Sequence, residues 1–348
     1  MLLILLMVGG LVTGCGGEEQ ALDHGTDENG DEQVDPTEAY RIVTLAPALT
    51  QIIWDIGLGH RIVGVANMDN VAAEGVPAVG NFNDLNYERL VTLKPTHVFM
   101  MSTSQGVPPR LSELARSQDF GLFVYPYPDN VDDILRIIYA GPDDPESAAS
   151  VPVDVGTALG YETEARNVYI RLLARLSELK NLLEDQPRPR VLMVIGVTPD
   201  TMASGPDTVL DNTLTWFCNA ENAAGEATVQ APRYDREQLL VMNPDVIVLI
   251  LPNDPPLAPL DSEPRLAAFR GLDITAVNEG RITLIRDPLA TLPSSAQAKV
   301  AAMLAKAVHP EMAEQIDQVM AGRGPESSVA PDSVDDPETA DESDAVTP

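Results

Sequence analysis

The sequence predicts an α/β protein with two lobes, each built on a mainly parallel sheet, joined by one long interdomain helix. Strand-like and helix-like segments alternate along the chain, and this alternation favours parallel sheets. One helix–turn–strand unit occurs twice, 149 residues apart, which indicates two similar lobes. Between the two copies, apolar residues keep helical spacing over a long stretch.

The N-terminal lobe, expected over residues 40–157, consists of short β-branched runs separated by helical patterns. The expected strands are 41–45, 61–66, 97–101 and 122–125, and the expected helices are 50–57, a short one after Asn86, one near 110–118, and 131–139. Residues 140–153 are rich in Pro, Gly, Asp and Ser, which predicts a surface insertion.

The helix between the lobes is expected within residues 158–186, as one continuous helix over 158–183. Two prolines just after this stretch end the helix. The C-terminal lobe, expected over 187–310, opens with a strand at 191–197 and closes with an amphipathic helix at 294–307. The apolar positions of the bridging helix are Ala165, Val168, Leu172, Leu173, Leu176, Leu179 and Leu183.

In both copies of the repeated unit, a capping residue stands two positions before a Glu, and a proline follows that Glu by seven positions. The pairs are Asn86 with Glu88 and Asp235 with Glu237. The capping side chain and the carboxylate both favour a helix N-terminus, and the proline ends the helix. One such Glu would only stabilise its own helix. The repetition predicts one exposed Glu on an equivalent first turn in each lobe.

The formal net charge of −31 is concentrated at the two ends of the chain. Residues 16–39 contain nine acids and residues 325–348 contain eight, and neither segment contains Lys or Arg. Both segments are expected to stay disordered because they have little apolar content to bury. No basic stripe is present to neutralise phosphates, so nucleic acid is excluded as a partner.

The N-terminus predicts where the protein works. Met1–Val8 is apolar but much shorter than the roughly 20 residues that a membrane-spanning helix needs, so a cleaved signal is expected over 1–15. Val12–Cys15 matches the small-residue pattern that precedes the lipidated cysteine of bacterial lipoproteins. Cys15 then carries the lipid, and residues 16–39 become an acidic tether. The protein is expected to be an extracytoplasmic, membrane-anchored monomer, and a plain secretory signal is the alternative.

Other side chains give little support for catalysis. Cys218 lies in an apolar helical stretch, which favours a buried core thiol over a nucleophile. The four histidines are scattered without a partner at ligand spacing, so no metal site is expected. Trp54 and Trp216 lie within predicted helices and are expected to be core anchors. Neither enzymatic activity nor a resident cofactor is predicted.

Five short segments occur in an informative order and spacing: Arg41–Thr50, Ile62–Val65, Val79–Phe82, Leu90–Pro95 and Asn243–Val248. Together they resemble the substrate-binding proteins of ABC transporters for iron siderophores, haem and cobalamin. The resemblance extends from about Arg41 to His309. It implies the architecture of the helical-backbone metal receptors, in which a single long helix bridges two lobes.

The resemblance also implies roles for single residues. Glu88 and Glu237 correspond to the two glutamates, one in each lobe, that engage arginines of the permease subunits. Where the cobalamin-binding branch has an arginine and an aromatic residue, the resemblance places Thr291 and Ala231 of this sequence. The ligand-binding positions that the resemblance implies are Met68, Phe82, Met101, Met202 and Asp287.

The resemblance therefore implies a lipid-anchored binding protein that captures a metal chelate or corrinoid between its lobes. It would deliver this small molecule to a dimeric ABC permease and its ATPase. Which of siderophore, haem and cobalamin is the ligand stays open. The rival interpretations are an extracytoplasmic sensor or scaffold lipoprotein with the same fold and, with less support, a cell-surface hydrolase.

Overall fold

A computed structural model of the chain describes residues 40–67, 69, 71–72, 74–81, 84–102, 106–128, 130–138, 154–197, 200–251, 256–259 and 262–322. These residues belong to one compact unit. The predicted signal with Cys15, the acidic tether, the insertion at 140–153 and the acidic tail at 325–348 lie outside the described residues.

The first sheet has four strands in the order β2-β1-β5-β6, and every neighbouring pair is parallel, as the sequence predicts. A short antiparallel ladder joins β3 and β4. The strands are β1 (Ile42–Thr44), β2 (Ile62–Gly64), β3 (Gly80–Asn81), β4 (Asp84–Leu85), β5 (His97–Met101) and β6 (Gly121–Tyr125). The helices are α1 (Pro47–Asp55), the 3₁₀ helix η2 (Gly59–Arg61), α2 (Tyr87–Thr92), α3 (Pro109–Gln118) and α4 (Val131–Ile138).

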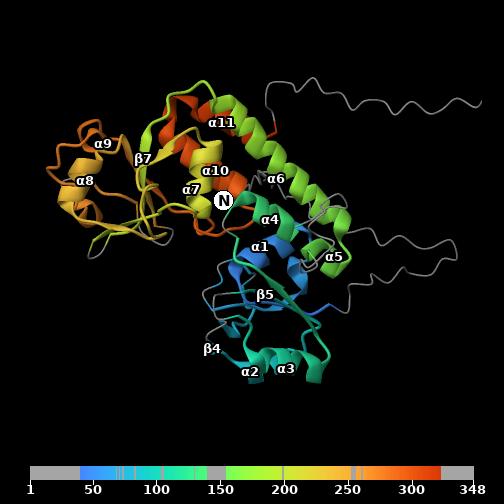
Figure 1. The fold of residues 1–348 in the computed structure, drawn as a ribbon. Coiled ribbons are helices and arrows are strands. Elements are labelled where there is room, and N and C mark those ends of the chain that lie inside the picture. The colour runs from blue at the N-terminus through green and yellow to red at the C-terminus, as the bar shows by residue number, and fades with distance from the viewer. Residues whose placement is uncertain are drawn as a thin grey trace, which may run out of the picture. The chain divides into compact units, whose positions relative to one another are not determined.

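Helices cover both faces of this sheet: α2 and α3 lie on one side, and α1 and α4 lie on the other (Figure 1). Alternation along the strands produces these two layers, because successive side chains point to opposite faces. Val98 and Met100 of β5 pack with the helices α2 and α3. Phe99, between them, packs with α1 and α4.

The predicted continuous helix over 158–183 is wrong at its start. The chain forms a short helix α5 (Val155–Leu159), turns at Gly160 with φ at +66°, and then forms α6 (Glu162–Leu183). Gly160 ends α5 because glycine adopts the left-handed conformation without a Cβ penalty. The 22 residues of α6 span roughly 33 Å and pack against α4 and α5 as well as against α7, α10 and α11. One long helix therefore contacts helices from both halves of the chain.

The second sheet is mixed rather than wholly parallel. Its central strands β7 and β11 and the edge strand β12 are parallel, whereas β8 pairs antiparallel with both β7 and β10. The strands are β7 (Arg190–Gly196), β8 (Thr201–Ala203), β9 (Glu221–Asn222), β10 (Arg233–Tyr234), β11 (Val246–Ile250) and β12 (Ile282–Ile285). The helices are α7 (Val209–Phe217), α8 (Arg236–Met242), η3 (Pro264–Leu266), α9 (Thr275–Asn278), α10 (Gln297–Val308), η4 (Pro310–Met312) and α11 (Ala313–Met320).

The second sheet also has two covered faces. In Figure 1, α8 and α9 lie on one side of β7, and α7 and α10 lie on the other. The inner residues divide accordingly: Ile247 and Leu249 of β11 pack with α8 and α9, and Val248 packs with α7 and α10. Each half of the chain thus has the three-layer arrangement that alternating strands and helices favour.

The two tryptophans are not core anchors, contrary to the prediction. Trp54 is 39% exposed and Trp216 is 43% exposed. Each lies on an amphipathic helix whose buried face is occupied by other residues. The Trp54 ring covers Gly59, where an added Cβ would lie 2.1 Å from the ring. Trp216 makes an edge contact with Phe217, with 6.3 Å between ring centroids.

Candidate functional site

The two predicted Glu helices are α2 and α8, and both begin as the sequence indicates. The Asn86 side chain accepts a hydrogen bond of 2.9 Å from the backbone N–H of Arg89 at the start of α2. At the start of α8, the Asp235 side chain accepts a hydrogen bond of 2.9 Å from the backbone N–H of Gln238. The Gln238 side chain in turn accepts a hydrogen bond from the backbone N–H of Asp235, which completes a capping box. Glu88 and Glu237 lie in the first turns of these helices and are exposed.

Both helices also end in the same way. Lys94 follows α2 with φ at +47°, and Asn243 follows α8 with φ at +42°. Each of these left-handed residues precedes a proline, which cannot continue the helix. The chain then enters β5 in the first half and β11 in the second. The repeated unit is thus repeated in its backbone conformation as well as in its sequence.

An arginine at or just before the start of the first strand in each half anchors the end of the Glu helix. Arg41 Nε donates to the carbonyl of Leu93 at 2.8 Å, and Arg190 Nη1 donates to the carbonyl of Met242 at 2.7 Å. Each bond spans 52 residues in the sequence, and the two arginines are 149 residues apart, like the two glutamates. These bonds tie the C-terminal end of each Glu helix to its sheet.

The backbone of each arginine makes a second pair of equivalent contacts. The Arg41 N–H donates to Thr96 Oγ1 at 2.9 Å, and the Arg190 N–H donates to Asp245 Oδ2 at 2.8 Å. Sequence reasoning missed both arginines, although their spacing relative to the glutamates is visible in the sequence. The helix, its anchor and the strand that follows form one structural unit that presents the same carboxylate in each half.

A chain of hydrogen bonds shapes the carboxyl edge of the first sheet. Thr44, the last residue of β1, contacts the hydroxyl of Thr50 at 2.7 Å, and Thr50 Oγ1 donates to Asp69 Oδ2 at 2.6 Å. The other Asp69 oxygen accepts the backbone N–H groups of Val71 and Ala72 at 2.9 and 3.1 Å. This network of two buried hydroxyl groups and one half-buried carboxylate fixes the loop after β2 against α1. Ligands of open α/β sheets bind at such carboxyl edges.

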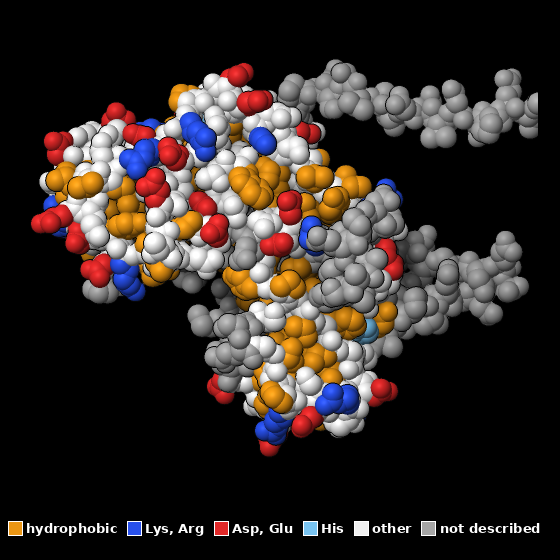
Figure 2. Space-filling model, in the orientation of Figure 1, with side chains coloured by type: hydrophobic (Ala, Val, Ile, Leu, Met, Phe, Trp, Pro, Cys, Tyr) orange, Lys and Arg blue, Asp and Glu red, His pale blue; other side chains and the backbone are white. Residues whose placement is uncertain are grey.

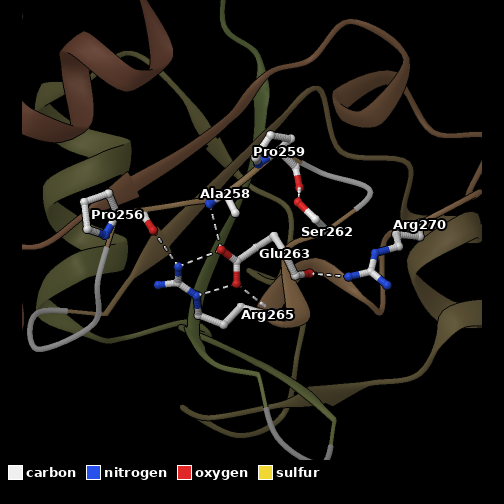
Figure 3. Close-up of polar contacts among 7 residues, drawn as sticks. All are labelled: Pro256, Ala258, Pro259, Ser262, Glu263, Arg265 and Arg270. Atoms are coloured by element: carbon white, nitrogen blue, oxygen red, sulfur yellow. Dashed lines mark hydrogen bonds and ion pairs between the residues drawn. The ribbon is translucent and has the colours of Figure 1, made fainter.

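A carboxylate also organises the segment that follows β11 in the second sheet, as Figure 3 shows. Glu263 is buried, and the Arg265 guanidinium donates hydrogen bonds of 2.7 and 2.8 Å to its two carboxylate oxygens. The backbone N–H of Ala258 donates to the same carboxylate at 2.9 Å. Arg265 also donates to the carbonyl of Pro256, and Arg270 to the carbonyl of Glu263. Hydrogen bonding to Arg265 and to backbone N–H groups lowers the pKa of Glu263 to about 2.

The predicted ligand-binding residues lie in different surroundings. Met68 and Phe82 are outside the described residues. Met101 ends β5 and is buried in the hydrophobic core, with 6% of its surface exposed. Met202 lies on β8, half-buried, where its side chain covers Gly196. Their role as ligand contacts stays a prediction.

Asp287, the fifth predicted position, is held by protein contacts. Its Oδ2 forms an ion pair of 2.5 Å with Lys299, and its Oδ1 accepts the backbone N–H of Leu289 at 2.8 Å. These contacts fix the segment between β12 and α10. Thr291, where the resemblance places a lost arginine, is exposed in the same segment.

A polar contact joins α1 to the segment that leads into α10. Ser295 Oγ donates to Asp55, and Gln51 Nε2 donates to the same carboxylate at 2.8 Å. Burial raises the pKa of Asp55 above its ordinary value. The neighbouring cavity of about 260 Å³ includes Arg171 and Arg175 of α6. This volume is below the range of roughly 300 to 1,000 Å³ typical of organic ligand sites.

The single cysteine of the described residues lies in the core. Cys218 is fully buried, and burial raises its pKa, so the predicted core thiol is confirmed. Within the described part of the chain, no cluster of three or more His, Cys, Asp or Glu residues has the geometry to hold a metal ion. None of the helices described is both long and apolar enough to cross a membrane.

Comparisons with known proteins agree with this architecture. The chain is 24% identical over 214 residues to a vitamin B12-binding protein of Vibrio vulnificus, covering 60% of this chain and 70% of that protein. It is 28% identical over 217 residues to an uncharacterised ABC transporter substrate-binding lipoprotein of Bacillus subtilis, covering 61% and 63% of the two chains.

Among solved structures, the periplasmic haem-binding protein of Roseiflexus in its apo form has the same fold, with a TM-score of 0.59 and 21% identity. The match covers 78% of this chain and 98% of that one. Residues 42–288 match the periplasmic binding protein family, in agreement with the resemblance inferred from the sequence. The chain therefore belongs to the periplasmic binding protein family.

Proposed function

We propose that this protein is the lipid-anchored substrate-binding component of an ABC importer. It binds a metal chelate or corrinoid, namely an iron siderophore, haem or cobalamin, in a cleft between its lobes. It then delivers this ligand to a permease dimer that is powered by its ATPase. Catalysis is no part of this function.

The observation that carries the proposal is the equivalence of the two Glu helices. Glu88 and Glu237 are exposed on the first turns of two similar helices. Each helix has a side-chain N-cap, a left-handed residue after its C-terminal end and an arginine that anchors that end. A stable fold does not need two exposed carboxylates in matching positions, whereas a partner with two equivalent subunits does. Charge pairs at such a rim steer the encounter and fix its orientation.

The ligand class rests on three supports. Relatives and structural neighbours include proteins named for vitamin B12 and for haem. The carboxyl edges of both sheets carry loops fixed by carboxylates, the half-buried Asp69 and the buried Glu263. The proposed contacts Met68, Met101 and Met202 would form an apolar, adaptable lining with Phe82.

Lipid anchoring through Cys15 is proposed from the sequence alone. Membership of the periplasmic binding protein family supports a position outside the cytoplasm. A related Bacillus subtilis protein is named a substrate-binding lipoprotein. Residues 16–39 would tether the binding domain to the membrane with a root-mean-square reach of about 5–6 Å times the square root of their number.

Purification from native cells tests the ligand class, with absorbance spectroscopy and mass spectrometry of the molecule that copurifies. Titration of the stripped protein with cobalamin, haem and a ferric hydroxamate siderophore should then give one saturable 1:1 complex. Phe82→Ala should weaken that complex about ten- to a hundredfold by removing an apolar contact surface. Trp216→Ala, which removes a 43% exposed aromatic side chain from the last turn of α7, is the matched control. If none of the three compounds binds, the proposed ligand class is wrong.

A further inference from the structure

A groove of about 810 Å³ lies directly beside one of the two proposed docking glutamates. Glu237 lines the groove, as do the aliphatic side chains of Val229 and Val241. A second carboxylate, Glu226, lies in the same lining. The proposed docking charge therefore stands at the edge of a partly apolar depression.

Two of the apolar side chains that line this groove are strongly exposed. Val241 is 86% exposed, Val229 is 56% exposed and Leu240, on the same helix as Val241, is 47% exposed. Figure 2 shows hydrophobic side chains beside Asp and Glu side chains at the end of the molecule that carries α8. Aliphatic residues gathered at one surface and bordered by charge are typical of a protein interaction site.

The equivalent position in the first half has different chemistry. Thr92 of α2 corresponds to Val241 of α8, again 149 residues away. Its hydroxyl donates to the carbonyl of Glu88 at 2.8 Å, so the polar group is satisfied within its own helix. The aromatic ring of Tyr87 is covered by the guanidinium of Arg110, 4.5 Å from the ring centroid. Among the described residues, the exposed Val241 of α8 therefore has a polar counterpart, Thr92, on α2.

The charges at the groove indicate what it accepts. Arg190 lines it, but its guanidinium is held by the carbonyl of Met242. Glu226 and Glu237 are exposed carboxylates suited to a cation, and the exposed Arg233 is suited to an acid at the rim. A segment with an arginine next to an aliphatic residue complements this lining, since its cation faces Glu237 while its apolar side chain lies against Val241.

We propose that the groove beside α8 receives an extracytoplasmic segment of the permease that presents an aliphatic side chain next to the arginine bound by Glu237. This inference rests on the proposed function and extends it. The two glutamates provide equivalent charge contacts, and the groove adds an apolar contact on one side only. The two permease subunits are then held by unequal contacts, a charge contact alone at Glu88 and a charge contact with an apolar contact at Glu237.

The test compares Val241→Asn with Thr92→Asn, the same neutral residue at equivalent positions of the two helices. The probes are the organism's own permease–ATPase complexes of the cobalamin, haem and siderophore importer class, each purified in nanodiscs. Val241→Asn should weaken binding about ten- to a hundredfold, the effect of losing one buried aliphatic contact. Thr92→Asn should change the affinity for the permease less than about threefold, because this variant removes no aliphatic contact. Both variants should bind the small-molecule ligand as the wild type does.

Two further measurements distinguish a failure of the groove assignment from a failure of the proposed docking through Glu88 and Glu237. If Glu88→Ala with Glu237→Ala weakens permease binding while Val241→Asn does not, the groove assignment fails and the proposed function stands. If neither change weakens binding, both proposals fail. Light scattering of the purified protein tests a second copy as the occupant. A wild-type dimer that Val241→Asn converts to monomers would assign the groove to self-association and overturn the inference.

Discussion

At the scale of single residues, two carboxylates with several hydrogen bonds each fix the segments that border the carboxyl edges of the sheets. Asp69 holds backbone N–H groups of the loop after β2, and Glu263 holds the segment after β11 through Arg265. Neither carboxylate was predicted from the sequence, because its hydrogen-bond partners are brought together by the folded loop and belong to no sequence motif. The sequence signals that succeeded, the caps of α2 and α8, involve partners three residues away.

Glu263→Gln should make the protein less stable at pH 7 but change stability little near pH 2. The folded-state pKa of Glu263, about 2, lies below the ordinary value of 4.5. Its contribution to stability is therefore fully present above about pH 4.5 and is lost as the pH falls toward 2. Thermal unfolding of both proteins across this range measures the effect. Glu279→Gln, an exposed substitution, is the control. A difference in midpoint that does not change with pH would contradict the assignment.

At the scale of elements, the repeated helix–turn–strand unit was predictable because caps, first-turn acids and terminal prolines are local signals. The parallel strands were predictable from alternation with helices. The antiparallel strands β8 and β10 were not predicted, because each has only two or three residues and pairs through tertiary contacts. The break before α6 was missed because apolar spacing continues across Gly160.

Gly160→Ala should destabilise the protein by about 1–2 kcal/mol, the cost of holding a residue with a Cβ in the left-handed conformation. No atom lies within 4 Å of the Cβ that would be added, so the backbone alone sets the effect. Urea denaturation measures it. Gly160→Asn should cost less, since asparagine tolerates this conformation better. Equal midpoints for wild type and Gly160→Ala would contradict the observed φ of +66° at this position.

At the scale of the whole molecule, most of the fold was predictable from the sequence. The proposed function has two parts, permease docking and ligand binding, and the structure describes all of the named residues only for docking. The docking half rests on Glu88 and Glu237, which the structure places on equivalently capped first turns. The ligand half depends on residues that include Met68 and Phe82, outside the described part. A ligand site also depends on side chains from several loops, which a single sequence does not bring together.

Removal of residues 324–348 should change the unfolding midpoint by less than about 2 °C. This segment contains eight acids and no cation, so it has little apolar surface to bury on the domain. Scanning calorimetry of the full chain and of the shortened chain makes the comparison. A loss of several degrees would show that the acidic segment contributes to the folded domain.

The most direct test of the central claim is the affinity of the ligand-loaded protein for its permease–ATPase complex in nanodiscs. Glu88→Ala combined with Glu237→Ala should weaken this binding at least tenfold, because both carboxylates lie on exposed, equivalently anchored first turns. Glu164→Ala, which removes an exposed first-turn acid of α6, should leave the affinity unchanged. Ligand affinity should be the same in all three proteins. Undiminished permease binding by the double variant would contradict the account.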